Sequence, residues 1–259
     1  MIRGLYTGAS GMLAEMARTD VISNNLANVN TTGFKKDRTI FRAFSEMNIH
    51  RVNDPVMVGF DRTIDPKPFI GMLGTGVMLD EVNVDFSPGI IKTTSNPLDL
   101  ALKGEGFFEI ETDNGLRYTR DGNFSMNQNG YITTKEGYYV LGQDGPVVLP
   151  REGDILISKQ GDIVVDGQYI DRIRVVTFAD TNLLLKEGDN LYLSEVPPIE
   201  QTDMNNVEVV QGALEGANLN TVTEMVDLIT AFRAYEASSK VIKTHDETLE
   251  RAVNEIARL

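Results

Sequence analysis

The sequence predicts an α+β fold in which two long terminal helices bracket an inserted antiparallel β domain. Three observations support this prediction: an amphipathic pattern near each end of the chain, a period-two apolar pattern between them, and recurrent turn signals in that middle part. A lone amphipathic helix has no surface on which to bury its apolar face. Helices at opposite ends of one chain are therefore expected to pair with each other as a coiled-coil layer.

The carboxy-terminal helix is expected to run from about residue 222 to the end of the chain. A narrow apolar seam recurs at every seventh position: Leu228, Tyr235, Ile242, Leu249 and Ile256. A flanking series follows three residues later: Ala231, Ser238, His245, Ala252 and Leu259. Thr221 and Glu224 have the spacing of a capping box, in which a hydroxyl and a carboxylate each bind an otherwise unpaired backbone amide at the start of a helix.

The amino-terminal helix is predicted from apolar residues at spacings of three and four. The series is Ile2, Leu5, Ala9, Met12, Met16, Thr19, Ile22, Leu26 and Val29. Gly4, Gly8 and Gly11 interrupt it, although each glycine costs a helix interior about 1 kcal/mol relative to alanine. Two interpretations stay open, a frayed start or a face pressed against another backbone. Gly33 is expected to end the helix in a left-handed conformation.

These patterns divide the chain into three parts: a terminal helical part at 1–33 and 218–259, an extended basic connector at 34–76, and a β-rich part at 77–217. Within the β-rich part, alternating residues on either side of Asp113-Asn114-Gly115 predict a hairpin. The sequence at 153–157 is echoed at 161–165, which two adjacent strands explain without a longer repeat array.

Composition limits the classes of function. The 259 residues carry a formal net charge of −14 with an isoelectric point near 4.6, a balance that repels phosphate backbones and argues against nucleic acid as a partner. Cysteine is absent, which removes disulfides and thiolate chemistry. No window is long and apolar enough to suggest membrane insertion, and Glu15 interrupts the first apolar run before it reaches the length of a signal-peptide core.

Candidate sites for chemistry are weak. The segment from Ser125 to Glu136 has the spacing of a calcium loop, but it lacks the first carboxylate, and its Asn-Gly pair favours a β-turn. Carboxylates cluster at Asp80, Glu81 and Asp85 and at Glu109, Glu111 and Asp113. Strand alternation is expected to place Glu109 and Glu111 on a solvated face. His245 lies on the helix seam, where a packed histidine is favoured over a metal ligand, so we predict no catalytic, cofactor or metal site.

Three sets of stretches carry a further signal: Ser23–Lys35, Asn96–Phe108 followed by Tyr118–Phe124, and Glu215–Asn220 leading through Phe232–Glu236 to Ser239–Asp246. They resemble the hook and basal-body rod family of bacterial flagellar axial proteins, occur in the family's order and cover most of the chain. The resemblance identifies the family and leaves open a distal or a proximal rod member.

The resemblance implies a structural subunit that polymerises through its terminal helices into a hollow axial shaft, with the β domain as an outer layer. It implies homo-oligomerisation, contacts with other rod and hook proteins and with ring proteins, a periplasmic location in the basal body, and type III export without a cleaved signal. The expected assembly residues are Leu5, Met12, Met16, Ile22, Leu26, Asn28, Leu228, Tyr235, Ile242, His245, Leu249 and Ile256, with Thr221 and Glu224 as the helix cap.

Two other functions stay open at this point. The carboxylate clusters are compatible with an enzyme acting on cell-wall glycan, because such enzymes use paired carboxylates. Amphipathic terminal helices are also compatible with a binding module that oligomerises through them and presents its β domain to a surface ligand.

Overall fold

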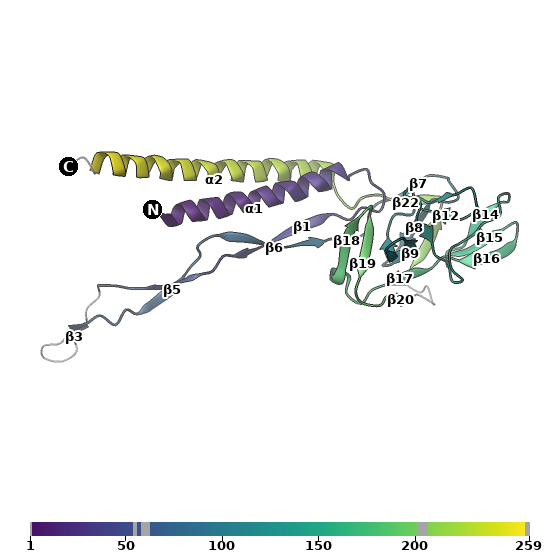
Figure 1. Cartoon of the computed structure of the whole chain (residues 1–259), viewed down its shortest axis with the longest axis horizontal. Coiled ribbons are helices and arrows are strands. Elements are labelled where there is room, and N and C mark those ends of the chain that lie inside the picture. Colours follow the sequence, from purple (N-terminus) through teal and green to yellow (C-terminus); the bar gives the residue numbers. More distant parts are fainter. Residues whose placement is uncertain (1, 54–55, 58–62, 201–206, 257–259) are drawn as a thin grey trace. The chain divides into compact units, whose positions relative to one another are not determined.

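A computed structural model describes residues 2–53, 56–57, 63–200 and 207–256. Helix α1 (Ile2–Ala27) opens the chain, helix α2 (Thr221–Ile256) closes it, and antiparallel β structure lies between them in the sequence (Figure 1). The predicted α+β class is confirmed. The chain forms two compact units: a terminal unit of Met1–Ser23, Arg38–Asn83 and Met225–Leu259, and a β unit of Asn24–Asp37 and Val84–Glu224.

The terminal unit contains both helices over most of their length together with a ladder of short strand pairs. The pairs are β1 (Asp37–Ala43) with β6 (Val77–Val84), β2 (Met47–His50) with β5 (Phe69–Leu73), and β3 (Val56–Met57) with β4 (Thr63–Ile64). Much of the segment expected to be an extended connector is therefore hydrogen-bonded in strands. The Thr7 hydroxyl donates to the Thr75 carbonyl at 2.8 Å and ties this ladder to α1.

A nine-stranded sheet forms the centre of the β unit. Its main path is β11-β12-β13-β9-β10-β19-β18, and β17 pairs with both β9 and β20. The strands are β9 (Phe107–Thr112), β10 (Gly115–Thr119), β11 (Ser125–Met126), β12 (Ile132–Thr133), β13 (Tyr139–Val140), β17 (Val175–Thr177), β18 (Leu184–Gly188), β19 (Leu191–Ser194) and β20 (Ile199–Glu200). A short 3-10 helix, η1 (Thr181–Leu183), precedes β18.

Smaller strand groups complete the β unit. A three-stranded sheet contains β14 (Ile155–Ile157), β15 (Asp162–Val165) and β16 (Gln168–Arg172). Two further antiparallel pairs are β7 (Ile91–Thr93) with β22 (Ala213–Glu215) and β8 (Leu100–Lys103) with β21 (Glu208–Gln211). These last two pairs join strands that are more than a hundred residues apart in the sequence.

Local sequence signals account for several of these pairings. Thr112 pairs with Gly115 across the predicted hairpin turn, and Gly115 has φ of +101°, which favours glycine. The two echoed segments pair as β14 and β15, with Leu156 opposite Val164. The calcium-like spacing is also a hairpin turn, because the Asn127 side chain accepts hydrogen bonds from the amides of Asn129 and Tyr131.

Two hydrophobic clusters fill the β unit. The larger cluster is formed by alternating strand residues and includes Leu100, Phe108, Ile110, Ile163 and Ile173, each no more than 1% exposed. The smaller cluster contains Phe107, Tyr118, Val176, Leu184 and Tyr192, with Phe86 and Phe178 packed against it. Phe107 and Phe108 are neighbours on β9 and enter different clusters, so this central strand is covered on both faces.

Coverage of both faces explains why the expectation for Glu109 is wrong. Its side chain is buried, and its carboxylate pairs with Arg174 Nη1 at 3.1 Å, whereas Glu111 is exposed as expected. Simple alternation assumes that one face of a strand meets water, and that assumption fails at the middle of a covered sheet.

Candidate assembly surfaces

Helices α1 and α2 lie side by side in the terminal unit (Figure 1), and three glycines of α1 face side chains of α2 closely. A Cβ atom added to Gly4 would lie 2.8 Å from His245 Cε1, one added to Gly8 would lie 3.0 Å from Ile242 Cγ1, and one added to Gly11 would lie 3.3 Å from Ser238 Oγ. The partners run backwards along α2, so the helices are antiparallel. Close packing, rather than fraying, explains the glycine cluster.

Most of the expected seam residues lie on the partly covered side of their helices. On α2, Leu228, Tyr235, Ile242, His245 and Leu249 are half-buried. On α1, Leu5, Met12 and Leu26 are half-buried and Ile22 is buried, while Met16 is 54% exposed. Ile256 is the last residue of α2, and its side chain lies outside the described part of the structure. Most of the expected seam side chains are thus partly covered in the helix pair, and Met16 is exposed.

Both helices also carry a second, uncovered apolar face. Its larger members are at least 47% exposed: Tyr6, Leu13 and Met16 on α1, and Val222, Met225, Val226, Ile229 and Phe232 on α2. Met225, Ile229 and Phe232 follow one another at helical spacings of four and three. A contiguous exposed apolar stripe of this kind marks an interaction surface more often than a solvated helix face. We call these residues the outer helix face.

The start of α2 differs from the expected capping box. The Asn220 side chain accepts hydrogen bonds from the amides of Val222 at 2.9 Å and Thr223 at 3.4 Å, so Asn220 is the cap and Thr221 is the first helical residue. Asparagine is among the strongest capping residues, which explains the shift by one position. Glu224 is buried, and its carboxylate lies 3.9 Å from Lys36 Nζ.

The end of α1 also differs from the expected position. The helix stops at Ala27 and is followed by a turn, while Gly33 adopts the left-handed conformation six residues later, with φ of +67°. Asn28 belongs to that turn: its side chain donates to the Asn24 carbonyl at 2.9 Å and accepts from the Thr31 hydroxyl at 3.1 Å. A Cβ on Gly33 would lie 2.5 Å from the Asp121 amide nitrogen, so close approach to another backbone requires glycine here.

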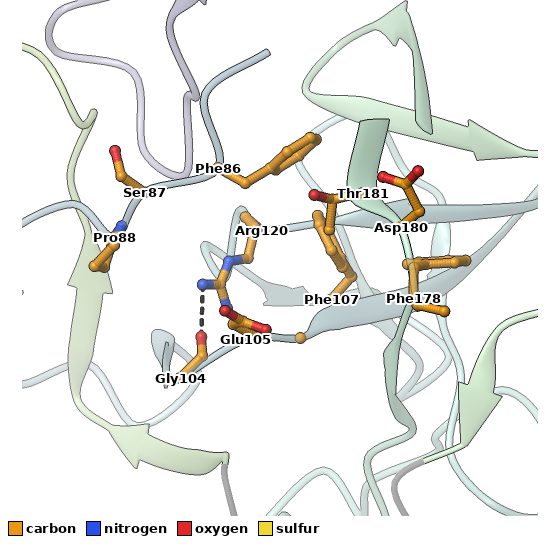
Figure 2. A pocket seen from close by; sticks show the side chains of 12 residues that line it. Phe86, Ser87, Pro88, Gly104, Glu105, Phe107, Arg120, Phe178, Asp180 and Thr181 are labelled. Atoms are coloured by element: carbon orange, nitrogen blue, oxygen red, sulfur yellow. Dashed lines mark hydrogen bonds between the residues drawn. The ribbon is translucent and has the colours of Figure 1, made fainter. Parts of the chain in front are cut away.

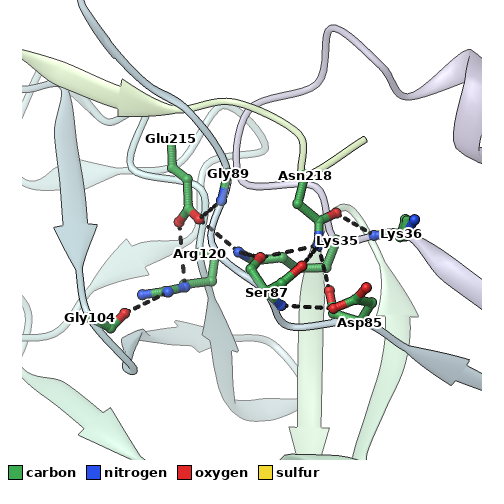
Figure 3. Close-up of polar contacts among 9 residues, drawn as sticks. All are labelled: Lys35, Lys36, Asp85, Ser87, Gly89, Gly104, Arg120, Glu215 and Asn218. Carbon is green, nitrogen blue, oxygen red and sulfur yellow. Dashed lines mark hydrogen bonds and ion pairs between the residues drawn. The ribbon is translucent and has the colours of Figure 1, made fainter. Parts of the chain in front are cut away.

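A buried ionic cluster lies in the β unit, where the segments after α1 and before α2 meet (Figure 3). Lys35 Nζ donates to Glu215 Oε1 at 2.7 Å and to the Ser87 carbonyl at 2.8 Å. Arg120 Nε lies 3.5 Å from Glu215 Oε2, and Arg120 Nη2 donates to the Gly104 carbonyl at 2.7 Å. The three charged side chains are 1% to 4% exposed.

Burial dominates the electrostatics of this cluster. Loss of hydration lowers the pKa of Lys35, and the carboxylate of Glu215 opposes that shift by favouring the charged amine. Burial likewise lowers the pKa of Arg120 against the influence of Glu215. With Lys35 and Arg120 charged, one carboxylate faces two cations in a low-dielectric environment.

Sequence reasoning missed this cluster, because it treated Lys35 as part of an exposed basic connector. A usable signal was present: Lys35 and Glu215 both lie in the stretches that carry the family resemblance. Asn218 reinforces the same junction. Its Oδ1 accepts from the Lys36 amide at 2.9 Å, and its Nδ2 donates to the Asp85 carbonyl at 2.7 Å (Figure 3).

The described residues contain no group of three or more His, Cys, Asp or Glu side chains placed to hold a metal ion. Over the same residues, neither helix is long and apolar enough to cross a membrane. His245 lies against Gly4 on the helix interface, as expected of a packed histidine.

The architecture defines a class of protein in which paired terminal helices with an uncovered apolar face flank a self-contained β unit. Three family models match this chain: "Flagella basal body rod protein" over residues 5–35, "Flagellar hook protein FlgE/F/G D1 domain" over residues 101–167, and "Flagellar basal body rod FlgEFG protein C-terminal" over residues 210–255.

Curated relatives match over nearly the whole length. The chain is 37% identical to flagellar basal-body rod protein FlgG of Caulobacter vibrioides, over 96% of this chain and 97% of that protein. It is 31% identical to flagellar hook-basal body complex protein FlhO of Bacillus subtilis over 100% of both chains, and 34% identical to FlgG of Buchnera aphidicola over 97% and 98%. The chain belongs to the flagellar basal-body rod protein family.

Proposed function

We propose that this protein is a structural subunit of the bacterial flagellar basal-body rod and that it polymerises through its terminal helices. The main observation behind this proposal is the outer helix face, which is exposed in a single chain although the two helices already pair with each other. Burying apolar area at about 25 cal/mol per Å² makes association with further helices favourable. Relatives of nearly the same length that are named as basal-body rod proteins support this proposal.

The finer parts of the proposal follow the family resemblance. Copies of the chain assemble as a hollow helical shaft with the terminal helices inside and the β units outside, in contact with other rod and hook proteins and with ring proteins. The subunit reaches the periplasmic part of the basal body by type III export, without cleavage of a signal peptide. It contributes structure and no catalysis.

The assembly role is tested by replacing Ile242, the seam residue against Gly8, with aspartate. An uncompensated carboxylate at a helix interface opposes burial, so we expect Ile242→Asp to abolish incorporation into the rod and swimming. The β unit, which has its own core, should unfold at an unchanged denaturant midpoint. Swimming at the wild-type rate would refute the assembly role of this seam.

Thr244→Asp serves as a matched control, because it adds the same charge at an exposed position one half-turn away. It is expected to leave the α1–α2 pair intact, as measured by helical circular dichroism. Electron microscopy of the concentrated wild-type protein separates two modes of association. Helical tubes support a rod subunit, whereas a small closed bundle would support an oligomeric binding module instead.

A further inference from the structure

The β unit contains a pocket of about 480 Å³ whose walls are aromatic (Figure 2). Phe86, Phe107 and Phe178 line it together with the guanidinium of Arg120, and Glu105 and Asp180 also contribute to the lining. Phe107 contacts both other rings edge to face, with centroids 5.5 Å and 5.7 Å apart. The volume lies within the range of sites that bind small ligands or one or two side chains.

The wall formed by Arg120 carries an unused hydrogen-bond donor. Arg120 is 4% exposed, its Nη2 is bound to the Gly104 carbonyl, and its Nη1 has no hydrogen-bond partner among the described residues. Lys35 and Arg120 share the single carboxylate of Glu215. The three buried side chains together carry one excess positive charge, on which the carboxylates of Asp85 and Glu105 also act. Arg120 Nη1 and Glu215 Oε2 are both buried without a hydrogen-bond partner in the described part of the chain, and a buried donor without an acceptor is costly to maintain.

The acidic residues of the pocket differ from this cluster in their exposure. Glu105 and Asp180 are exposed, and the Asp180 side chain accepts a hydrogen bond from the Asn182 amide. Exposed charges are screened by water and salt, whereas buried ones are screened much less. The inner wall of the pocket is thus positive and aromatic. The negative charges of Glu105 and Asp180 are at exposed positions, where screening by water and salt weakens their effect.

We propose that this pocket binds a polypeptide segment of a partner protein in which an aromatic side chain lies next to a carboxylate. The ring packs edge to face on Phe107 and Phe178, and the carboxylate accepts a charge-assisted hydrogen bond from the Arg120 guanidinium. The choice of a polypeptide rests on the proposed function, because a rod subunit is surrounded by other protein subunits. The site is separate from the outer helix face.

The test uses the full chain and two blocked dipeptides, N-acetyl-Phe-Glu-amide and N-acetyl-Phe-Gln-amide, which differ in one charge. Titration is followed through the backbone amide signals of Gly106 and Thr181 by nuclear magnetic resonance. The glutamate peptide is expected to shift both signals and to bind about tenfold more tightly than the glutamine peptide. Equal affinities, or shifts confined to residues outside the pocket, would overturn the proposal.

Variants locate the charge that is recognised. Arg120→Gln is expected to remove the preference for the glutamate peptide. Because that change also leaves Glu215 with one partner fewer and is able to unfold the β unit, Glu105→Gln provides an independent measurement. Removing the Glu105 charge should tighten binding of the glutamate peptide about two- to threefold, and weaker binding would contradict the proposal.

Arg151→Gln is the control, since it removes an exposed arginine whose Nη2 is bound to the Gln128 carbonyl and which does not line the pocket. It changes the net charge as Arg120→Gln does and should leave both affinities unchanged. A loss of preference in this variant would show that only the overall charge is sensed. Rod incorporation by Ile242→Asp is measured separately, so failure of peptide binding and failure of the proposed function give different results.

Discussion

The terminal unit and the β unit use apolar residues in opposite ways. Almost all buried apolar residues of the described chain belong to the β unit, and the terminal unit contributes Ala14, Ile22 and Ala231. The helices instead expose Tyr6, Leu13 and the apolar stripe of α2. The β unit is therefore stabilised by an apolar core of its own, whereas the helices of the terminal unit bury few large apolar side chains.

The largest effect is expected in the ionic cluster of the β unit. Glu215→Ala leaves Lys35 and Arg120 buried without their carboxylate and should lower the free energy of unfolding by about 3–5 kcal/mol. Urea unfolding of the full chain, followed by near-ultraviolet circular dichroism of the tyrosines, measures this change. Glu208→Ala removes a carboxylate that pairs with two exposed lysines, and its effect should stay below about 1 kcal/mol.

A smaller effect is expected where the helices of the terminal unit approach each other. Gly4→Ala places a methyl group against the His245 ring and should destabilise the helix pair by about 1–3 kcal/mol, despite the higher helix propensity of alanine. Thermal loss of helical circular dichroism provides the measurement. Combining this change with His245→Ala should recover most of the loss, and additive effects would show that the two residues do not meet.

The effect of removing the N-cap side chain distinguishes Asn220, the observed cap of α2, from Thr221, the expected one. Asn220→Ala should reduce the free energy of unfolding of α2 by about 1 kcal/mol, because two amides lose their acceptor. Thr221→Ala should cost less, since Thr221 is already helical. Hydrogen exchange at the Val222 and Thr223 amides reports the difference, and a larger effect at Thr221 would restore the capping-box interpretation.

Tyr192 is expected to make the stability of the β unit modestly dependent on pH. Burial raises the pKa of its phenol, the nearby Asp37 charge adds to the shift, and Arg120 opposes it. Because the pKa of the phenol is higher in the folded protein than in the unfolded chain, the neutral phenol contributes to stability. This contribution is complete below the pKa of the unfolded chain, near 10.0, and is lost as the pH rises toward the pKa of the folded protein. The β unit should thus lose stability above about pH 10.

Tyr192→Phe tests that origin. The Tyr192 hydroxyl has no hydrogen-bond partner among the described residues, so its removal should change the stability at neutral pH by less than about 1 kcal/mol. The variant should also lose less stability than the wild type between pH 9 and pH 11 in urea titrations. An unchanged pH dependence would assign the loss to other groups.

Periodicity predicted what depends on neighbouring residues in the chain. The two helices, the hairpin around Asp113 and the α2 seam follow from spacings of two, three and four, because such spacings fix which side chains share a face. Family resemblance then supplied the order of the parts. The α2 seam stays a prediction as an assembly surface, although its residues lie on the partly covered side of the helix.

The missed features all depend on contacts between distant segments. Glu109 was assigned to solvent because alternation cannot reveal that both faces of β9 are covered. Lys35 was assigned to a connector because its partner Glu215 is 180 residues away. The sequence could not decide between fraying and close packing for the three glycines, because His245 and Ile242, which face two of them, are more than 200 residues away in the chain.

The junction at Asn218 has a consequence for the chain as a whole. Asn218 is hydrogen-bonded to the Lys36 amide and to the Asp85 carbonyl, so three stretches at which the chain enters or leaves the β unit lie together within it. An insertion with adjoining ends can change in size or sequence without changing the separation that its flanking helices must span. The β unit is therefore able to change in size while the same pair of terminal helices is kept.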